Sequence, residues 1–281
     1  MNKMKIAFLG CGSMGEAIMA GLLQSDSATQ WTVVATTRSE IRAAHLRAAH
    51  GIIATSTAEK PSANIEAAEG ASIIILGTKP YGIGSLVSEI APSLHPKTIV
   101  ITVAAATSLE YVEQELPPQQ PTVRAMPNTP FKVGRGIVGL TGGKYVTTEQ
   151  LRRAGTIFEA SGIVIEIPET LQDAVSAISG SGPAYVFYLA EAMAEAARNL
   201  GIDEETATIL ARQTVIGAGA LLERSDMSPR SLRRAVSSPN GTTERAIATF
   251  EQHKFADIVS KGAAAATVRA AEMAHELQHK K

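Results

Sequence analysis

The stretch "KIAFLGCGSMGEAIMAGLL", Lys5 to Leu23, decides the fold. An apolar run leads directly into Gly10, Gly12 and Gly15, spaced as G-x-G-x-x-G, and helix-forming residues follow. In a strand-turn-helix unit the first glycine permits the tight turn, the second lets a pyrophosphate approach the backbone, and the third lets helix and strand pack closely. Free amides at the helix start bind anions. The stretch therefore predicts a dinucleotide site that opens a Rossmann domain.

Similar apolar runs continue through the first half of the chain and alternate with helical patterns. Runs of Ile, Val and Leu without polar alternation are typical of strands that helices cover on both faces. We therefore expect an α/β domain over residues 1–168, with a doubly wound, mostly parallel sheet. The predicted strands lie at 5–10, 31–37, 71–78, 98–105, 122–127, 136–141 and 162–167.

After Pro168 the strand patterns stop and apolar residues recur three and four apart. We expect an all-α domain over residues 169–281. Its "IGAGALL" and "KGAAAATVRAA" segments allow helix backbones to approach closely, which fits either a helical core or an intertwined dimer. The predicted helices are 183–200, 203–224, 229–236, 242–252 and 255–279.

The charge balance of the chain limits the kinds of partner that it can attract. Lys and Arg total 26 against 27 Asp and Glu, so no overall field attracts nucleic acid or an anionic membrane, and a small ligand is favoured. No segment approaches the roughly 18 uninterrupted apolar residues of a membrane span. Cys11 is the only cysteine. A chain without an internal disulfide fits a reducing compartment, so we expect a cytoplasmic protein.

The end of the second predicted strand indicates which dinucleotide binds. An NAD site usually has Asp or Glu there, whereas this strand ends "ATTRSE". The hydroxyls of Thr36, Thr37 and Ser39 and the guanidinium of Arg38 suit a 2′-phosphate, which favours NADP. Glu40 lies near enough to keep NAD open.

Three other segments carry polar groups at predicted loops. "LGTKP" ends a strand with Lys79, which fits a base, a phosphate contact or a solvated lysine. In "RAMPNTP" two prolines flank Asn128 and Thr129, giving a rigid loop or a plain turn. "SGSGPAY" reads as a hinge that aims Ser179 and Ser181 toward a cleft between the domains, or as a helix cap.

One metal-like motif, "HELQH" from His275 to His279, lies at the C-terminus. On a helix its histidines share a face, and Glu276 would be the general base of a zinc site. A helix end frays and no third ligand follows, so we expect no metal.

Five motifs together resemble the pyrroline-5-carboxylate reductase family: "FLGCGSMGEAI", "GTKP", "VRAMPNTP", "SAISGSGPAY" and "SSPNGTTERAI". They occur in the family's order and cover nearly the whole chain. The resemblance implies a Rossmann domain followed by a helical dimerisation domain, with active sites where the helices of two subunits meet and often a ring of dimers. It also implies NADPH as the cofactor, with NADH possible, and Δ1-pyrroline-5-carboxylate as the substrate, reduced to L-proline in the last step of proline biosynthesis.

The resemblance also assigns residues to the cofactor. The glycine turn would hold the pyrophosphate, Thr37 and Arg38 would lie near the 2′-phosphate, and Asn64 would lie near the adenosine. The "GTKP" loop and the end of the fourth predicted strand would line the nicotinamide side. The full set is Gly10, Cys11, Gly12, Ser13, Met14, Gly15, Thr36, Thr37, Arg38, Asn64, Gly77, Thr78, Lys79, Pro80, Val103, Ala104 and Ala105.

For the substrate, the resemblance singles out the break in the helical half at "SSPNGTTERA". Pro239 would end one helix, Asn240 and Gly241 would turn the chain, and Thr242 would cap the next. Backbone amides from Asn240 to Thr243 would bind the carboxylate, and the Thr243 hydroxyl would meet the ring nitrogen. The predicted catalytic residues are Thr243, Ser179, Ser181 and Asp226, and the predicted substrate-binding residues are Asn128, Asn240, Gly241, Thr242 and Thr243.

The chain departs from the family at three places. The family often has glycine where Ala106 and Asn240 stand, and Val or Ala-Val where Gly77 and Thr78 precede Lys79. Two other functions stay open: an NADP-dependent reductase of another cyclic imine or a β-hydroxyacid, and a non-catalytic dinucleotide-binding regulator.

Overall fold

A computed structural model of the chain describes residues 3–279, which form two compact units. The first unit extends from the N-terminal end to Gly180 and includes the chain again from Ala266. The second unit is Ser181–Ala265. The last strand ends at Glu166, close to the predicted change from strands to helices. The domain boundary at residue 168 stays a prediction.

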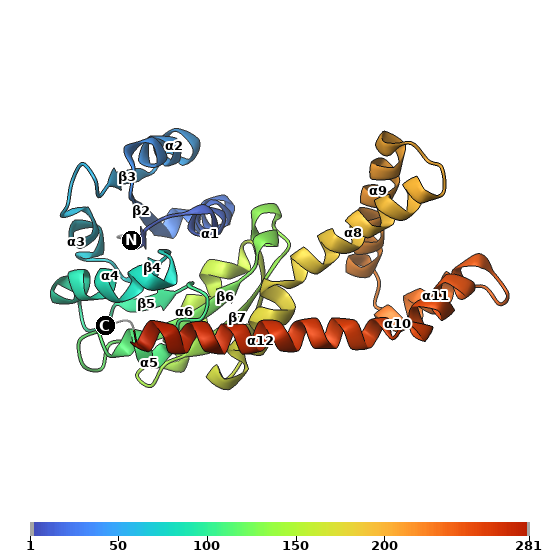
Figure 1. The fold of residues 1–281 in the computed structure, drawn as a ribbon. Helices are drawn as coiled ribbons and strands as arrows, with labels where there is room; N and C mark the ends of the chain where they lie inside the picture. The colour runs from blue at the N-terminus through green and yellow to red at the C-terminus, as the bar shows by residue number, and fades with distance from the viewer. Residues whose placement is uncertain (1–2, 280–281) are drawn as a thin grey trace. The chain divides into compact units, whose positions relative to one another are not determined.

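The described part of the first unit is built on one eight-stranded sheet of order β3-β2-β1-β4-β5-β6-β7-β8 (Figure 1). All neighbouring strands are parallel except β6 and β7, which are antiparallel. The order 3-2-1-4-5-6 is that of a doubly wound Rossmann sheet. The predicted fold class is confirmed. The strands are β1 (Met4–Leu9), β2 (Trp31–Thr37), β3 (Ile53–Ser56), β4 (Ile73–Leu76), β5 (Ile99–Thr102), β6 (Thr122–Pro127), β7 (Gly136–Gly142) and β8 (Gly162–Glu166).

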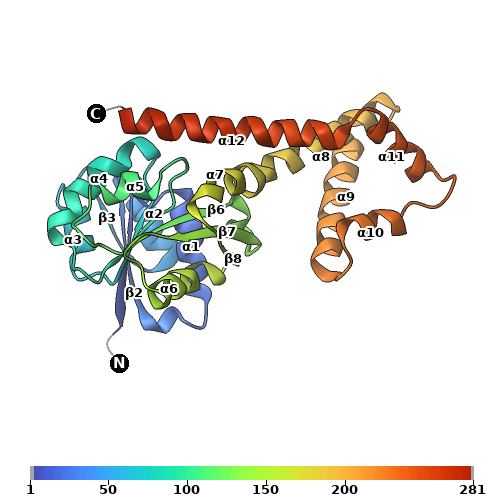
Figure 2. The ribbon, with the colours of Figure 1, turned by 90° about the horizontal axis from the view of Figure 1, so that it is seen from below.

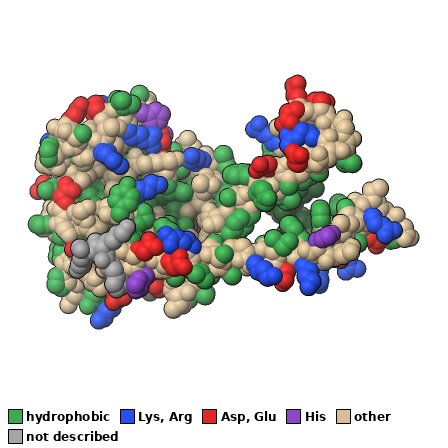
Figure 3. All heavy atoms as spheres, in the orientation of Figure 1, with side chains coloured by type: hydrophobic (Ala, Val, Ile, Leu, Met, Phe, Trp, Pro, Cys, Tyr) green, Lys and Arg blue, Asp and Glu red, His purple; other side chains and the backbone are tan. Residues whose placement is uncertain are grey.

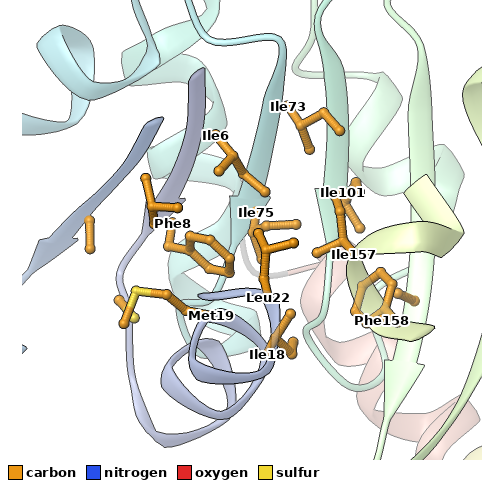
Figure 4. Close-up of a cluster of buried hydrophobic side chains, with 14 of the residues drawn as sticks. Ile6, Phe8, Ile18, Met19, Leu22, Ile73, Ile75, Ile101, Ile157 and Phe158 are labelled. Carbon is orange, nitrogen blue, oxygen red and sulfur yellow. The ribbon is translucent and has the colours of Figure 1, made fainter. Parts of the chain in front are cut away.

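Helices cover both faces of this sheet, so consecutive strand residues enter different cores. Ile6 and Phe8 of β1 belong to a cluster that α1 and α6 complete (Figure 4). Ala7 and Leu9 of the same strand belong to a second cluster with α4 and α5. Figure 2 shows α6 on one side of the sheet and α4 and α5 on the other. The helices are α1 (Ser13–Gln24), α2 (Glu40–His50), α3 (Ala63–Ala68), α4 (Ile83–Ile90), α5 (Leu109–Glu113) and α6 (Thr148–Glu159).

The edge strand β3 lies outside the predicted strands. It pairs with β2 in parallel register, with Val34 opposite Ile53. Only the first two of its four residues are apolar, and Ile53 is 65% exposed. An edge strand buries little, so its sequence carries almost no hydrophobic signal.

The second unit contains only helices in the described residues, and it buries very little by itself. Among the described residues of this unit, only Ala194, Ala207 and Ala211 are buried, whereas Phe187 and Tyr188 of α8 are 68% and 72% exposed. Hydrophobic side chains gather on its surface (Figure 3). A helical unit with so small a core needs a partner to cover its apolar faces. Its helices are α8 (Gly182–Asn199), α9 (Glu204–Arg224), α10 (Pro229–Ala235), α11 (Thr242–Gln252) and the first part of α12 (Phe255–His279).

The segment "SGSGPAY" is helical on both sides of Ser181, the first residue of the second unit, and its role as a hinge stays a prediction. α7 (Gln172–Val175) leads into a π-helical turn, Ser176–Gly180, which passes directly into α8. The Ser179 hydroxyl donates to the Val175 carbonyl at 2.9 Å. Gly180 ends the wider π-helical turn and Gly182 begins α8, so both glycines lie in helical segments.

Candidate active site

The glycine turn after β1 has the geometry that its spacing predicts. Gly10 has a φ of +66°, and a Cβ atom there would lie 2.3 Å from Cγ2 of Thr78. Gly15 packs against Cys11, whose Sγ would lie 3.3 Å from an added Cβ. A Cβ on Gly12 would meet only the Gly10 carbonyl oxygen, at 4.0 Å. The fold therefore requires glycine at position 10, Gly15 is closely packed, and Gly12 leaves open space beside the backbone.

Thr36 of β2 accepts hydrogen bonds from the first two amides of this turn. The Gly10 amide donates to the Thr36 hydroxyl at 3.1 Å, and the Cys11 amide donates to the Thr36 carbonyl at 2.7 Å. Within residues 3–279, the amides of Gly12, Ser13 and Met14 have no hydrogen-bond partner. These three amides at the start of α1 form the anion site that a pyrophosphate fits.

A pocket of about 480 Å³ lies at the carboxyl edge of β1, β2, β3 and β4. It brings together ten of the predicted cofactor residues: Gly10, Cys11, Gly12, Thr36, Thr37, Arg38, Asn64, Gly77, Thr78 and Lys79. Ser13, Met14, Gly15, Pro80, Val103, Ala104 and Ala105 are not among its lining residues. The "GTKP" loop thus shares a pocket with the end of β2, which is the adenosine end of a Rossmann site. Its assignment to the nicotinamide side stays a prediction.

The pocket also contains residues that the sequence reasoning missed. One wall of the pocket is a face of the α4 region, on which the lining residues recur three and four positions apart. This helical spacing is the signal in the sequence that could have grouped them on one face. Arg42 lies on α2, four residues after Arg38, which precedes this helix. The missed lining residues are Arg42, Thr57, Tyr81, Gly82, Ser85, Leu86 and Glu89.

The predicted role of the β2 hydroxyls needs a correction. The Thr36 side chain is 1% exposed, and its hydroxyl accepts from Gly10 and donates to Asn64. The Thr37 side chain is 3% exposed, and its hydroxyl donates to the Ser39 carbonyl at 2.9 Å. Both hydroxyls hold the chain in place and are not free for a 2′-phosphate. The exposed Arg38 and Ser39, together with Arg42, remain as donors on this wall.

Glu16 holds Arg42 at the pocket. Its Oε2 accepts from the Arg42 guanidinium at 2.7 Å, while Oε1 lies 3.0 Å from Nε2 of both His45 and His50. Burial alone would raise the pKa of Glu16, but hydrogen bonds with His50, Arg42 and His45 outweigh it and lower the pKa to about 2. Glu16 is therefore ionised wherever the protein is folded at ordinary pH.

We expect Glu16→Gln to destabilise the fold at neutral pH and to have little effect in acid. The depressed pKa means that the Glu16 contacts stabilise the fold above the ordinary carboxyl pKa of 4.5, and this contribution is lost as pH falls toward 2. The free energy of unfolding should drop by about 1 kcal/mol at pH 7, after allowance for partial exposure. Urea unfolding of both proteins from pH 7 to pH 3 measures the difference. A gap that stays constant over this range would contradict the assignment.

Cys11 is an inert part of the turn. It is 2% exposed, and burial, partly offset by Arg42, raises its pKa to about 12. Because the thiolate is the reactive form, Cys11 is no nucleophile.

The segment after β5 contains one of the departures from the family. Ala106 is buried and has a φ of +54°. A left-handed backbone favours glycine, which gives a physical reason for the glycine often found there.

Asn128 braces the first unit with both ends of its amide. Its Nδ2 donates to the Ser179 carbonyl at 3.1 Å, and its Oδ1 accepts from the Ile137 amide at 3.0 Å. The side chain is 7% exposed and ties the end of β6 to β7 and to the π-helical turn. Its direct contact with substrate stays a prediction.

The loop before α11 also differs in detail from its predicted form. α10 ends at Ala235, four residues before Pro239, and the N-cap of α11 is Gly241, so Thr242 is the first helical residue and not the cap. The Asn240 amide donates to Glu244 Oε2 at 2.7 Å, and the Gly241 amide donates to the Ser238 carbonyl at 3.0 Å.

These contacts reduce the number of backbone amides that are free to bind the substrate carboxylate. The Asn240 and Gly241 amides are occupied, whereas those of Thr242 and Thr243 have no partner in the described part of the chain. Thr243 is partly buried, and Asp226, after α9, is exposed. Ser181 is the first residue of the second unit and makes no side-chain cap for α8. The catalytic roles of Thr243, Ser179, Ser181 and Asp226 stay predictions.

Asn240 has a φ of +58°, which separates two kinds of substitution. Asn240→Gly should leave the free energy of unfolding within about 0.5 kcal/mol, because asparagine and glycine both adopt this conformation. Asn240→Val should cost about 1–2 kcal/mol, because a β-branched side chain is strained there. Chemical denaturation of the two variants measures the difference. Equal stabilities would contradict the left-handed turn.

The described residues contain no group of three His, Cys, Asp or Glu side chains that could hold a metal ion. Glu276 of the "HELQH" motif pairs with Arg269 at 2.8 Å, and the side chain of His279 lies outside the description. Within residues 3–279, none of the helices has both the length and the hydrophobicity of a transmembrane segment.

The Rossmann sheet, its glycine turn and the pocket beside it define a dinucleotide-dependent oxidoreductase with a C-terminal helical domain. A family model described as NADP oxidoreductase coenzyme F420-dependent matches residues 5–106, and one described as pyrroline-5-carboxylate reductase dimerisation matches residues 169–273. The pyrroline-5-carboxylate reductase of Pseudomonas aeruginosa is 36% identical, and the alignment covers 99% of each chain. The chain belongs to the pyrroline-5-carboxylate reductase family, as the sequence motifs predict.

Solved structures agree with this assignment over nearly the whole chain. The pyrroline-5-carboxylate reductase of Coxiella burnetii superposes with a TM-score of 0.88 at 34% identity, covering 96% of this chain and 98% of that one. The pyrroline carboxylate reductase of Plasmodium falciparum, solved with NADP bound, gives 0.81 at 27% identity, covering 98% and 99%. The helical half is thus a dimerisation domain, in keeping with its small core.

Proposed function

We propose that the protein reduces Δ1-pyrroline-5-carboxylate to L-proline with NADPH as the hydride donor, with NADH as a possible substitute. The full-length similarity to pyrroline-5-carboxylate reductases carries this proposal. Two features of the chain's own site support it: free amides at the glycine turn, and free amides at the start of α11. The first suits a pyrophosphate and the second suits a substrate carboxylate.

The residues present fit the cofactor. The amides of Gly12, Ser13 and Met14 would bind the pyrophosphate, and Gly12 leaves the backbone open to it. Arg38, Ser39 and Arg42 would bind the 2′-phosphate, since guanidinium groups pair well with phosphate. When bound, the nicotinamide supplies a hydride to the imine carbon of the substrate.

On the substrate side, the chain would contribute orientation and charge. The amides of Thr242 and Thr243 would hold the carboxylate at the α11 N-terminus, where the helix dipole favours an anion. The Thr243 hydroxyl would accept a hydrogen bond from the protonated ring nitrogen, and Asp226 would favour the positive charge of that iminium. Uptake of the hydride by the iminium carbon neutralises the ring nitrogen and gives the secondary amine of proline. Positioning in near-attack geometry would supply most of the rate enhancement.

The family match supports a dimer, and the larger assembly is proposed. The dimerisation domain places the chain in a dimer, and we propose that its active sites lie where two subunits meet and that dimers associate further into a ring. Light scattering on the purified protein measures the size. A dimer as the largest species would contradict the ring. The cytoplasmic location stays a prediction.

The direct test mixes purified protein with Δ1-pyrroline-5-carboxylate and NADPH or NADH, and follows cofactor consumption and proline formation. We expect proline in amounts equal to the NADPH consumed. A six-membered cyclic imine and a β-hydroxyacid with NADP⁺ test the alternative reductases. Faster turnover of either would overturn the substrate, and cofactor binding without turnover of any would favour the regulator.

A further inference from the structure

Three hydrogen bonds connect the cofactor turn to helix α4. The Gly10 amide donates to Thr36 Oγ1 at 3.1 Å, Thr36 Oγ1 donates to Asn64 Oδ1 at 2.7 Å, and Asn64 Nδ2 donates to Glu89 Oε2 at 3.0 Å. The four residues come from the β1 end, β2, α3 and α4, and all four line the same pocket. We refer to Gly10, Thr36, Asn64 and Glu89 as the relay.

Glu89 sets the direction of the relay. The Thr36 hydroxyl has one hydrogen and two lone pairs, so by itself it could accept from both Gly10 and Asn64. In the structure the Asn64 amide presents Oδ1 to Thr36 and Nδ2 to Glu89. A carboxylate only accepts hydrogen bonds, so Glu89 favours this orientation and penalises the flipped one.

Burial makes the relay more than a surface contact. Thr36 is 1% exposed and Asn64 is 9% exposed, so little water can reach their polar atoms to replace a lost hydrogen bond. Loss of an acceptor for a buried amide leaves it unsatisfied and free to reorient. The end of the relay that would feel this change is Gly10, whose left-handed φ of +66° sets the turn.

We propose that Glu89 is a positioning residue of the cofactor site, which fixes the Gly10 amide through Asn64 and Thr36 and so holds the turn ready for the pyrophosphate. Sequence motifs give no hint of this role, because Glu89 lies far from the glycines along the chain. The inference rests on the proposed use of a dinucleotide and adds a residue that controls its binding.

Two variants of Glu89 separate positioning from general stability. Glu89→Ala removes the acceptor, so NADPH should bind about tenfold more weakly, the order expected for loss of a hydrogen bond to a charged group. Glu89→Gln keeps a carbonyl acceptor for Asn64 and should bind within about threefold of wild type. Ser88→Ala is the matched control. It changes the residue next to Glu89 and removes a different hydrogen bond of α4, from the Ser88 hydroxyl to Glu115, so this variant should bind NADPH as wild type does.

Fluorescence titration gives the NADPH Kd, and the Gly10 amide signal reports on the relay itself. Labelling with ¹³C-leucine and ¹⁵N-glycine selects three Leu-Gly pairs, at Gly10, Gly77 and Gly201. The Gly10 signal should shift in Glu89→Ala and stay in place in Glu89→Gln and Ser88→Ala. Weakened binding with an unmoved Gly10 signal would overturn the relay, and so would unchanged binding. Absence of NADPH binding by the wild type would instead contradict the proposed function.

Discussion

Gly12→Ala should abolish cofactor binding at ordinary concentrations while leaving the empty protein nearly as stable as before. Gly12 has a φ of −84°, which alanine adopts freely, and an added Cβ meets only the Gly10 oxygen, at 4.0 Å. That methyl group would occupy the space through which the pyrophosphate reaches the amides of Ser13 and Met14. Loss of two such charge-assisted hydrogen bonds, each about 1.5–3 kcal/mol, predicts an NADPH Kd raised at least about 100-fold.

Gly10→Ala provides the contrast. Gly10 has a φ of +66°, and a Cβ added there would lie 2.3 Å from Thr78. Alanine at this position should therefore destabilise the protein even without cofactor. Thermal unfolding without cofactor and NADPH titration separate the two effects. For Gly12→Ala we expect a change in unfolding free energy of at most about 1 kcal/mol, the usual cost of alanine at an N-cap. Tight NADPH binding by Gly12→Ala would mean that the pyrophosphate does not lie on this turn.

Thr243→Ala should lower kcat/KM for Δ1-pyrroline-5-carboxylate by about 10- to 100-fold. The reason is the loss of a hydrogen bond between the Thr243 hydroxyl and the charged ring nitrogen, worth about 1.5–3 kcal/mol. The substitution keeps the backbone amide, so the proposed carboxylate contact should survive. NADPH binding should not change, because the cofactor turn belongs to the other unit.

Thr242→Ala is the matched control for this prediction. Thr242 is the exposed neighbour at the first position of α11, and only its backbone amide is assigned a role. Its kcat/KM should stay within about threefold of wild type. Equal losses in the two variants would point to a disturbed helix start, and wild-type turnover by Thr243→Ala would remove its hydroxyl from the reaction.

Much of the fold could be predicted because buried strands and helix starts leave strong signals. β2 and the helices α8 to α12 lie within one residue of their predicted bounds. The exceptions are segments with weak or ambiguous chemistry. β3 is a short edge strand, and "SGSG" contains residues that usually end helices but here lie at the junction of a π-helical turn and α8.

The site was harder to predict because a residue type does not reveal which way its side chain points. Thr36 and Thr37 stand where hydroxyls suit a phosphate, yet both hydroxyls serve the protein's own backbone or the Asn64 amide. Glu89 and Arg42 reach the pocket only because α4 and α2 pack beside the β-strand ends. Such contacts depend on tertiary packing, for which a single sequence has no local pattern.

Transfer of the hydride from NADPH to the substrate can be followed with an isotope label. The protein would be incubated with Δ1-pyrroline-5-carboxylate and NADPH carrying two deuterium atoms at C4 of the nicotinamide, and the proline analysed by mass spectrometry. We expect L-proline with one deuterium, located on the former imine carbon. Proline without deuterium, or no proline with either NADPH or NADH, would contradict it.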